Sequence, residues 1–218
     1  MVNERTFRIP VGDGAITAIE TPAEGKSAGW TFDYSPGAGS NVHDPFGTFA
    51  SRELASRGVR CVRIQFPYQE AKRKSPDRNE VLEATWRAAI EAVRDDNRLV
   101  VGGRSMGGRI ASQVVAQGVA VDALVLFAYP LHPPGRPEKR RDAHLSVIEV
   151  PALFCSGTGD AFASPEELVE AAALVPNAGV HMLEAADHGF AVRKLSGLTK
   201  DEVWREAVEE MWAWLGGL

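Results

Sequence analysis

The sequence has little cysteine: Cys61 and Cys155 are the only two among 218 residues. Two cysteines are too few for the disulfide framework of a small secreted domain or for a four-cysteine zinc site. Each lies in an apolar run, which favours a buried, reduced thiol. The chain also lacks an uncharged apolar run of the roughly 18 residues that a membrane helix needs, and its first residues lead into no apolar signal segment. We therefore expect a cytoplasmic protein without a membrane partner.

Basic residues are not in excess. Lysine and arginine total 24 against 29 aspartates and glutamates, a formal net charge of -5. An acidic total argues against nucleic acid as the partner. Internal repeats and low-complexity tracts are absent, and 44% hydrophobic with 24% charged residues is the usual globular mixture. We predict a single domain over residues 1–218.

Apolar runs typical of strands alternate with amphipathic helical patterns along most of the chain. The expected strands lie at residues 6–9, 15–20, 30–34, 59–66, 99–102, 121–128, 152–156 and 180–183. Helices are expected after Asp44-Pro45, across 82–93, across 106–117, and from the capping boxes that begin at Ser164 and Thr199. Residues 67–78 and 129–150 are expected to be irregular. This alternation predicts an α/β fold with a mostly parallel central sheet and helices on both faces.

The pattern Gly-x-Ser-x-Gly occurs at residues 103–107, with Ser105 at its centre. A nucleophile on a tight strand-to-helix turn has a strained backbone, and side chains two residues away on either side would collide. The pattern alone also fits a glycine-rich turn that only packs a strand against a helix. The apolar strand before it and the amphipathic helix after it favour a nucleophilic serine at the carboxyl end of the sheet.

A serine hydroxyl needs a base to accept its proton and an acid to orient that base. His188 lies in a loop just past the last expected strand, whereas His181 lies within that strand, so we predict His188 as the base. Asp160 follows the strand at 152–156, and we place it before Asp187, because a sequence neighbour of the histidine more often points away from its ring. The alternative role for Asp160 is a loop cap.

Hydrolysis of an acyl group also needs two donors for the oxyanion. The backbone N–H of Met106, at the start of a helix, is one candidate. The loop Pro36-Gly37-Ala38-Gly39 follows an early strand, and the N–H of Ala38 is the predicted second donor. A plain glycine turn is the alternative for this loop.

Three stretches give the chain a family resemblance: Gly-Ala-Gly at 37–39, Gly-Gly-Arg-Ser-Met-Gly-Gly-Arg at 102–109, and Tyr-Pro-Leu-His-Pro-Pro-Gly at 129–135. With the elements from residue 30 onward, the chain resembles an α/β-hydrolase. More narrowly, it resembles the small dienelactone-hydrolase-like proteins and their KANL/Tex-type branch. The resemblance implies an α/β-hydrolase fold and a catalytic triad more than it implies a substrate.

The residues implied by this resemblance are a triad of Ser105, Asp160 and His188, with Ala38 and Met106 as oxyanion donors. The chain departs from the family pattern at three points. Pro36 stands where the oxyanion loop usually begins with histidine. The nucleophile is serine, whereas dienelactone hydrolases themselves use cysteine. No insertion is long enough for a helical lid such as lipases have.

We therefore predict a serine hydrolase that cleaves a small carboxylic ester or thioester through an acyl-enzyme on Ser105. It needs no cofactor or metal and is a monomer or homodimer. A noncatalytic hydrolase-fold module that binds a partner protein is the alternative, and a peptidase is a third interpretation. The apolar C-terminal residues 211–215 are expected to pack on the body rather than form a dimer face.

Two basic segments follow expected strands, one at residues 72–78 and one at 136–141. Both begin at the carboxyl end of the sheet, where ligands bind in this class of fold. They predict either attraction of an anionic substrate or, as the simpler interpretation, a solvated surface. His132 and His144 lie on either side of the second segment; they could approach the pocket, but such histidines are more often surface or cap residues.

Overall fold

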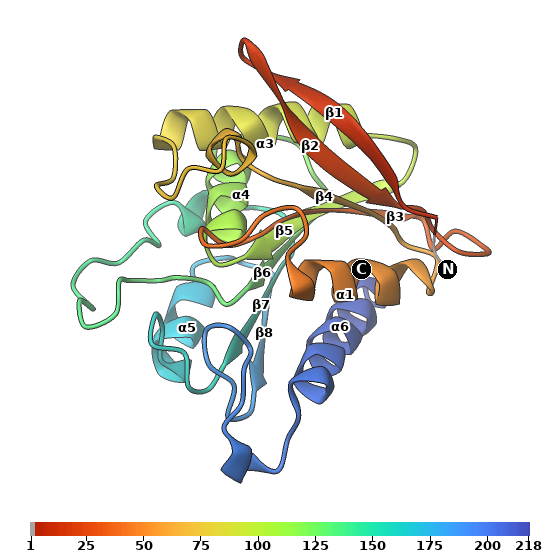
Figure 1. The fold of residues 1–218 in the computed structure, drawn as a ribbon. Helices are drawn as coiled ribbons and strands as arrows, with labels where there is room; N and C mark the ends of the chain where they lie inside the picture. Colours follow the sequence, from red (N-terminus) through yellow and green to blue (C-terminus); the bar gives the residue numbers. More distant parts are fainter. Residues whose placement is uncertain (1–2) are drawn as a thin grey trace.

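The computed structural model describes residues 3–218, whose centre is one eight-stranded sheet (Figure 1). The strand order is β1-β2-β4-β3-β5-β6-β7-β8. The strands are β1 (Arg5–Val11), β2 (Gly14–Thr21), β3 (Trp30–Ser35), β4 (Arg60–Ile64), β5 (Arg98–Arg104), β6 (Ala123–Phe127), β7 (Ala152–Gly157) and β8 (Ala178–Leu183). Strands β3 to β8 are parallel, and the β1–β2 hairpin joins antiparallel through β2 to β4.

Helices cover both faces of the sheet. They are α1 (Pro45–Ala55), α2 (Pro67–Glu70), α3 (Asn79–Val93), α4 (Met106–Ala116), α5 (Pro165–Ala172) and α6 (Lys200–Gly216), with 3-10 turns η1 (Leu145–Val147) and η2 (Lys194–Ser196). Helices α1 and α6 pack on one face, and α3, α4 and α5 pack on the other (Figure 1). The predicted fold class is confirmed. Between β6 and β7, the described chain contains only η1, so no helical lid is inserted there.

Side-chain caps that can be read from the sequence mark the starts of α1, α5 and α6. The side chains of Ser164 and Thr199 accept from the backbone three residues on, completing the capping boxes of α5 and α6. Asp44 caps α1 by accepting from the Gly47 N–H at 2.9 Å. Helices α2, α3 and α4 begin without a side-chain cap of this kind, and α2 is a four-residue helix in the segment expected to be irregular.

The C-terminal helix packs on the body, as predicted. Met211 and Leu215 are buried between α6 and the sheet. Farther toward its start, Trp204 makes an edge-on contact with Phe46 of α1, the ring centroids lying 5.7 Å apart. None of the helices within residues 3–218 is long and apolar enough to cross a bilayer.

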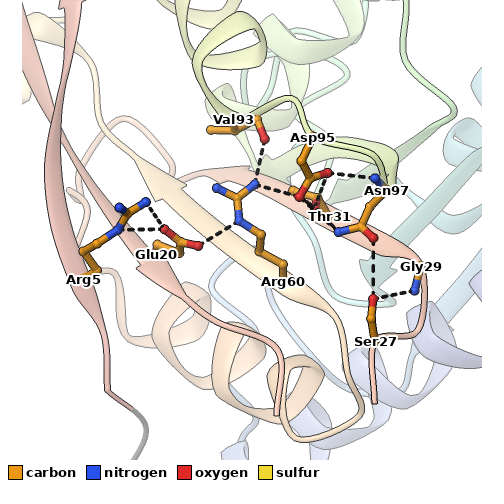
Figure 2. Close-up of polar contacts among 9 residues, drawn as sticks. All are labelled: Arg5, Glu20, Ser27, Gly29, Thr31, Arg60, Val93, Asp95 and Asn97. Carbon is orange, nitrogen blue, oxygen red and sulfur yellow. Dashed lines mark hydrogen bonds and ion pairs between the residues drawn. The ribbon is translucent and has the colours of Figure 1, made fainter. Parts of the chain in front are cut away.

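A polar network closes the amino ends of the central strands (Figure 2). The Arg60 guanidinium donates to Glu20 at 2.8 Å, to the Val93 carbonyl at 2.7 Å and to Asp95 at 3.3 Å. Asp33 lies one strand away in β3, fully buried, and neither of its carboxyl oxygens has a hydrogen-bond partner among the described residues. Burial raises the pKa of Asp33 to about 8. Arg60 is thus committed to other acceptors, and Asp33 stays unpaired.

Candidate active site

Ser105 lies on a strained turn between β5 and α4. Its backbone φ of 53° and ψ of -120° are rare for a residue with a side chain. A Cβ at Gly103 or Gly107 would lie 2.0 or 2.1 Å from the Ser35 carbonyl oxygen, so only glycine fits at either position. The two glycines of the motif therefore allow β3 to approach the turn closely, as the sequence predicted.

The structure brings Ser105, His188 and Asp160 into one hydrogen-bonded chain. His188 Nε2 lies 2.8 Å from Ser105 Oγ, and His188 Nδ1 lies 2.8 Å from Asp160 Oδ2. This fits a ring that donates from Nδ1 and accepts the serine proton at Nε2. The three residues come from the carboxyl ends of β5, β7 and β8, which parallel pairing places at one edge of the sheet.

Further contacts fix the acid and the base. The Asp160 side chain is fully buried and accepts from the Phe162 N–H at 2.8 Å and the Ser156 hydroxyl at 3.0 Å. The Phe162 ring stacks on His188 with 4.0 Å between centroids. His188 itself keeps 23% of its side chain exposed. The base is thus held on two sides and open on the side where a substrate would approach.

The competing residues have other partners. His181 Nε2 lies 2.8 Å from Glu206 on α6. Asp187 accepts from the backbone N–H groups of Gly189 and Ala191, so it shapes the loop that carries His188. Neither residue is bonded to the Ser105 chain, and the choice of His188 and Asp160 agrees with the geometry.

The predicted oxyanion loop lies against the serine turn. A Cβ at Gly37 would be 3.4 Å from the Ser105 Cβ. Ala38 and Met106 both line the cavity at Ser105, and within the described chain neither amide donates a hydrogen bond. Two free N–H groups beside the serine hydroxyl form a candidate oxyanion hole.

Side chains of helix α2 donate hydrogen bonds to the backbone carbonyls of this loop. The Gln69 amide donates to the carbonyls of Gly37 at 3.2 Å and Ser40 at 2.6 Å, and the Tyr68 hydroxyl donates to the Ala38 carbonyl at 2.8 Å. Burial raises the pKa of Tyr68 to about 12, so its hydroxyl remains a donor. No local sequence pattern marks Tyr68 or Gln69, so neither residue was predicted.

Asp44 connects the loop, α1 and the serine turn. This carboxylate is buried and accepts from the Tyr34 hydroxyl at 2.7 Å and the Ser40 hydroxyl at 3.0 Å, besides its helix-capping bond to Gly47. Arg104, the residue before Ser105, forms an ion pair with Asp44 at 3.0 Å. The Asp44 carboxylate thus binds polar groups of the loop, of α1 and of the serine turn, and it holds these three segments in fixed relative positions.

Comparison with known proteins decides the family. A family model described as an alpha/beta hydrolase domain matches residues 32–216. The chain belongs to the alpha/beta hydrolase family. The match confirms the predicted superfamily, and the matched residues include the serine turn, the candidate oxyanion loop and the loops that carry Asp160 and His188.

Solved alpha/beta hydrolases share the whole fold. An α/β serine hydrolase without a lid from Xanthomonas campestris is 17% identical, with a TM-score of 0.75 over 97% of this chain and 95% of that one. Est1E from Butyrivibrio proteoclasticus, bound to ferulic acid, is 14% identical, with a TM-score of 0.77 over 96% of this chain and 99% of that one. A dienelactone hydrolase from Anabaena variabilis is 18% identical, with a TM-score of 0.74 over 95% of this chain and 96% of that one. The expected likeness to dienelactone hydrolases holds for the fold.

Neither cysteine of this chain is placed to act as a nucleophile. Cys61 and Cys155 are both free and fully buried within the sheet. Burial raises the pKa of each thiol far above its usual range. The group at the strained turn is the Ser105 hydroxyl.

The cavity at Ser105 has a volume of about 670 Å³ and a strongly cationic lining. Its walls include Arg104, Arg109, Arg141 and Lys200. Of the second basic segment, only Arg141 lines this cavity. From the first segment, residues 72–74 line a neighbouring hollow of about 420 Å³ that shares residues 38–40 with it. His132 and His144 lie elsewhere, bonded to Glu167 and Ser112.

Proposed function

We propose that this protein is a serine hydrolase that cleaves a carboxylic ester or thioester through an acyl-enzyme on Ser105. The observation that carries the proposal is the His188 ring, hydrogen-bonded to Ser105 through one nitrogen and to Asp160 through the other. Est1E, solved with ferulic acid bound, has the same fold and adds support at the level of architecture. The chemistry uses only side chains and backbone amides of the chain.

In the first half-reaction, His188 Nε2 accepts the Ser105 proton while Oγ bonds to the acyl carbon. The resulting oxyanion accepts from the Ala38 and Met106 N–H groups. The buried Asp160 carboxylate stabilises the imidazolium. His188 then gives its proton to the departing alkoxide or thiolate, and the bond from the acyl carbon to that group breaks.

In the second half-reaction, water replaces the alcohol or thiol. His188 Nε2 accepts a proton from the water as its oxygen bonds to the acyl carbon, and then returns a proton to Ser105 Oγ as the acyl bond breaks. The products are a carboxylic acid and the alcohol or thiol. The exposed side of His188 is the side from which water enters.

Labelling with a fluorophosphonate and mass mapping of the adduct tests the proposal. We expect the adduct on Ser105, with labelling abolished in Ser105→Ala and slowed at least 100-fold in His188→Ala, since the base is then missing. His181→Ala is the matched control and should label at the wild-type rate. Absence of labelling in folded wild-type protein would contradict the proposal and favour a noncatalytic binding module.

A further inference from the structure

Two arginines in the Ser105 cavity have no carboxylate partner. Arg104 lines the same cavity but is neutralised by Asp44 at 3.0 Å. Arg109 and Arg141 form no ion pair with any residue from 3 to 218, and the only side-chain bond of Arg141 is to the Pro130 carbonyl at 3.4 Å. Guanidinium groups carry five donors each, so most donors of this pair are free to meet a ligand.

Arg109 is placed by helix α4, one turn after the serine. Its backbone N–H donates to the Ser105 carbonyl at 3.0 Å. Side chains on a helix tilt toward its N-terminus, which directs Arg109 back over the turn that carries Ser105. Four residues of helix correspond to about 6 Å, a distance that a small acyl chain spans.

Arg141 is placed by the loop between β6 and β7. Its N–H donates to the Leu131 carbonyl at 2.8 Å, and its carbonyl accepts from the Tyr129 hydroxyl at 2.7 Å. Both bonds tie residue 141 to the segment that leaves β6 beside the serine turn. The loop therefore returns one cation of the basic segment to the cavity, while its other basic residues do not line that cavity.

No carboxylate among the described residues pairs with either arginine, although the Glu83 charge acts on Arg109 without a direct bond. Asp142 pairs with Arg140 at 2.6 Å, and Glu83 accepts from the side-chain amides of Asn79 and Gln117. Burial and the Arg109 charge lower the pKa of His144 to about 4, so it is neutral at pH 7. Burial first, and the Arg141 charge second, lower the pKa of Arg109, while the Glu83 charge raises it by a smaller amount.

We propose that Arg109 and Arg141 together bind a carboxylate of the substrate, which is then a half-ester of a small dicarboxylic acid or its thioester counterpart. The inference rests on the proposed function, because it assigns the anionic group a place beside the Ser105 nucleophile. Paired guanidiniums match the two oxygens of a carboxylate, and bringing two like charges together is favourable once an anion lies between them. The cavity volume of about 670 Å³ accommodates a compact substrate.

The test compares ethyl hydrogen glutarate with its neutral isostere ethyl 5-methylhexanoate, by proton release at low salt. We expect wild-type kcat/KM to favour the anionic ester at least tenfold, and the preference to shrink as salt is added. The Arg109→Gln/Arg141→Gln protein should lose about 10- to 100-fold in the ratio of the two values, the usual range for bonds to a charged group. Lys139→Gln removes an exposed charge from the same loop and should keep the ratio.

Glutarate binding, measured by calorimetry, separates failure of this inference from failure of the hydrolase proposal. If Ser105 takes the fluorophosphonate but the wild type shows no anionic preference, or the double variant keeps it, the carboxylate site is refuted and the hydrolase stands. If Ser105 takes no label, the site is still supported when glutarate binds to the wild type and to Lys139→Gln but not to the double variant. No binding to wild type, or equal binding to the folded double variant, overturns it.

Discussion

Replacing Asp33 with asparagine should stabilise the protein, and increasingly so as the pH rises. Asp33 is fully buried in β3 and has no hydrogen-bond partner within residues 3–218. Burial raises its pKa from 3.8 to about 8. The folded protein therefore keeps the proton over a range where the unfolded chain has released it. Because the folded state binds more protons, this group makes the protein less stable as the pH rises from about 4 to about 8.

The size of the effect follows from the same shift. Each pH unit between the two pKa values changes the free energy of unfolding by about 1.4 kcal/mol. Between pH 5.5 and 7.5, Asp33 should lower that free energy by about 2 to 3 kcal/mol. Asparagine has the same shape and does not titrate. The gain from Asp33→Asn should therefore increase by about 2 to 3 kcal/mol over this range.

Urea unfolding followed by tryptophan fluorescence at the two pH values measures this difference. Asp96→Asn makes the same chemical change on the exposed surface and is the matched control. A gain for Asp33→Asn that is equal at both pH values would refute the reasoning. It would mean that Asp33 is ionised in the folded protein and finds a donor. Arg60 is the cation whose charge acts on Asp33, yet its guanidinium is already bonded to three acceptors (Figure 2).

Three further predictions concern the site and the packing around it. Gln69→Leu should lower kcat about tenfold with little change in KM, because the Ala38 N–H, the proposed oxyanion donor, loses its support. Steady-state kinetics will show a change in KM instead if Gln69 only shapes the substrate site. Iodoacetamide should modify neither Cys61 nor Cys155 in the native protein and both in urea; native modification would contradict their burial. Gly107→Ala should cost about 3 kcal/mol or more of stability in urea unfolding, since its Cβ would lie 2.1 Å from a backbone oxygen, whereas Gly39→Ala meets nothing within 4 Å and is the control.

The parts of the fold that the sequence predicts are those with local causes. Apolar runs mark buried parallel strands, and side-chain caps such as Ser164 mark helix starts, because both signals act within a few residues. The choice of Ser105 and His188 rests on the same kind of signal. One lies on a glycine-flanked turn and the other in a loop just past a strand end, and β5 and β8 carry both to one edge of the sheet.

The parts that the sequence could not predict depend on contacts between distant segments. Helix α2 is four residues long, too short to show a helical period, and is held by bonds such as that from Tyr68 to the oxyanion loop 30 residues earlier. Arg109 looks like an ordinary polar position on α4. The carboxylate site that we propose for it depends on Arg141, which the loop between β6 and β7 brings to the same cavity.

These distant contacts also bear on the loop that we propose as part of the oxyanion hole, which begins with Pro36 where the family resemblance implies a histidine. Pro36 is buried and offers no side-chain donor to hold the loop. Gln69 takes the Gly37 carbonyl from the α2 side. In a planar trans peptide the following N–H points the opposite way, so that bond directs the Ala38 N–H away from α2. We infer that support from α2 replaces a side chain at position 36, and that the loop keeps its orientation because its carbonyls, rather than its first residue, are held.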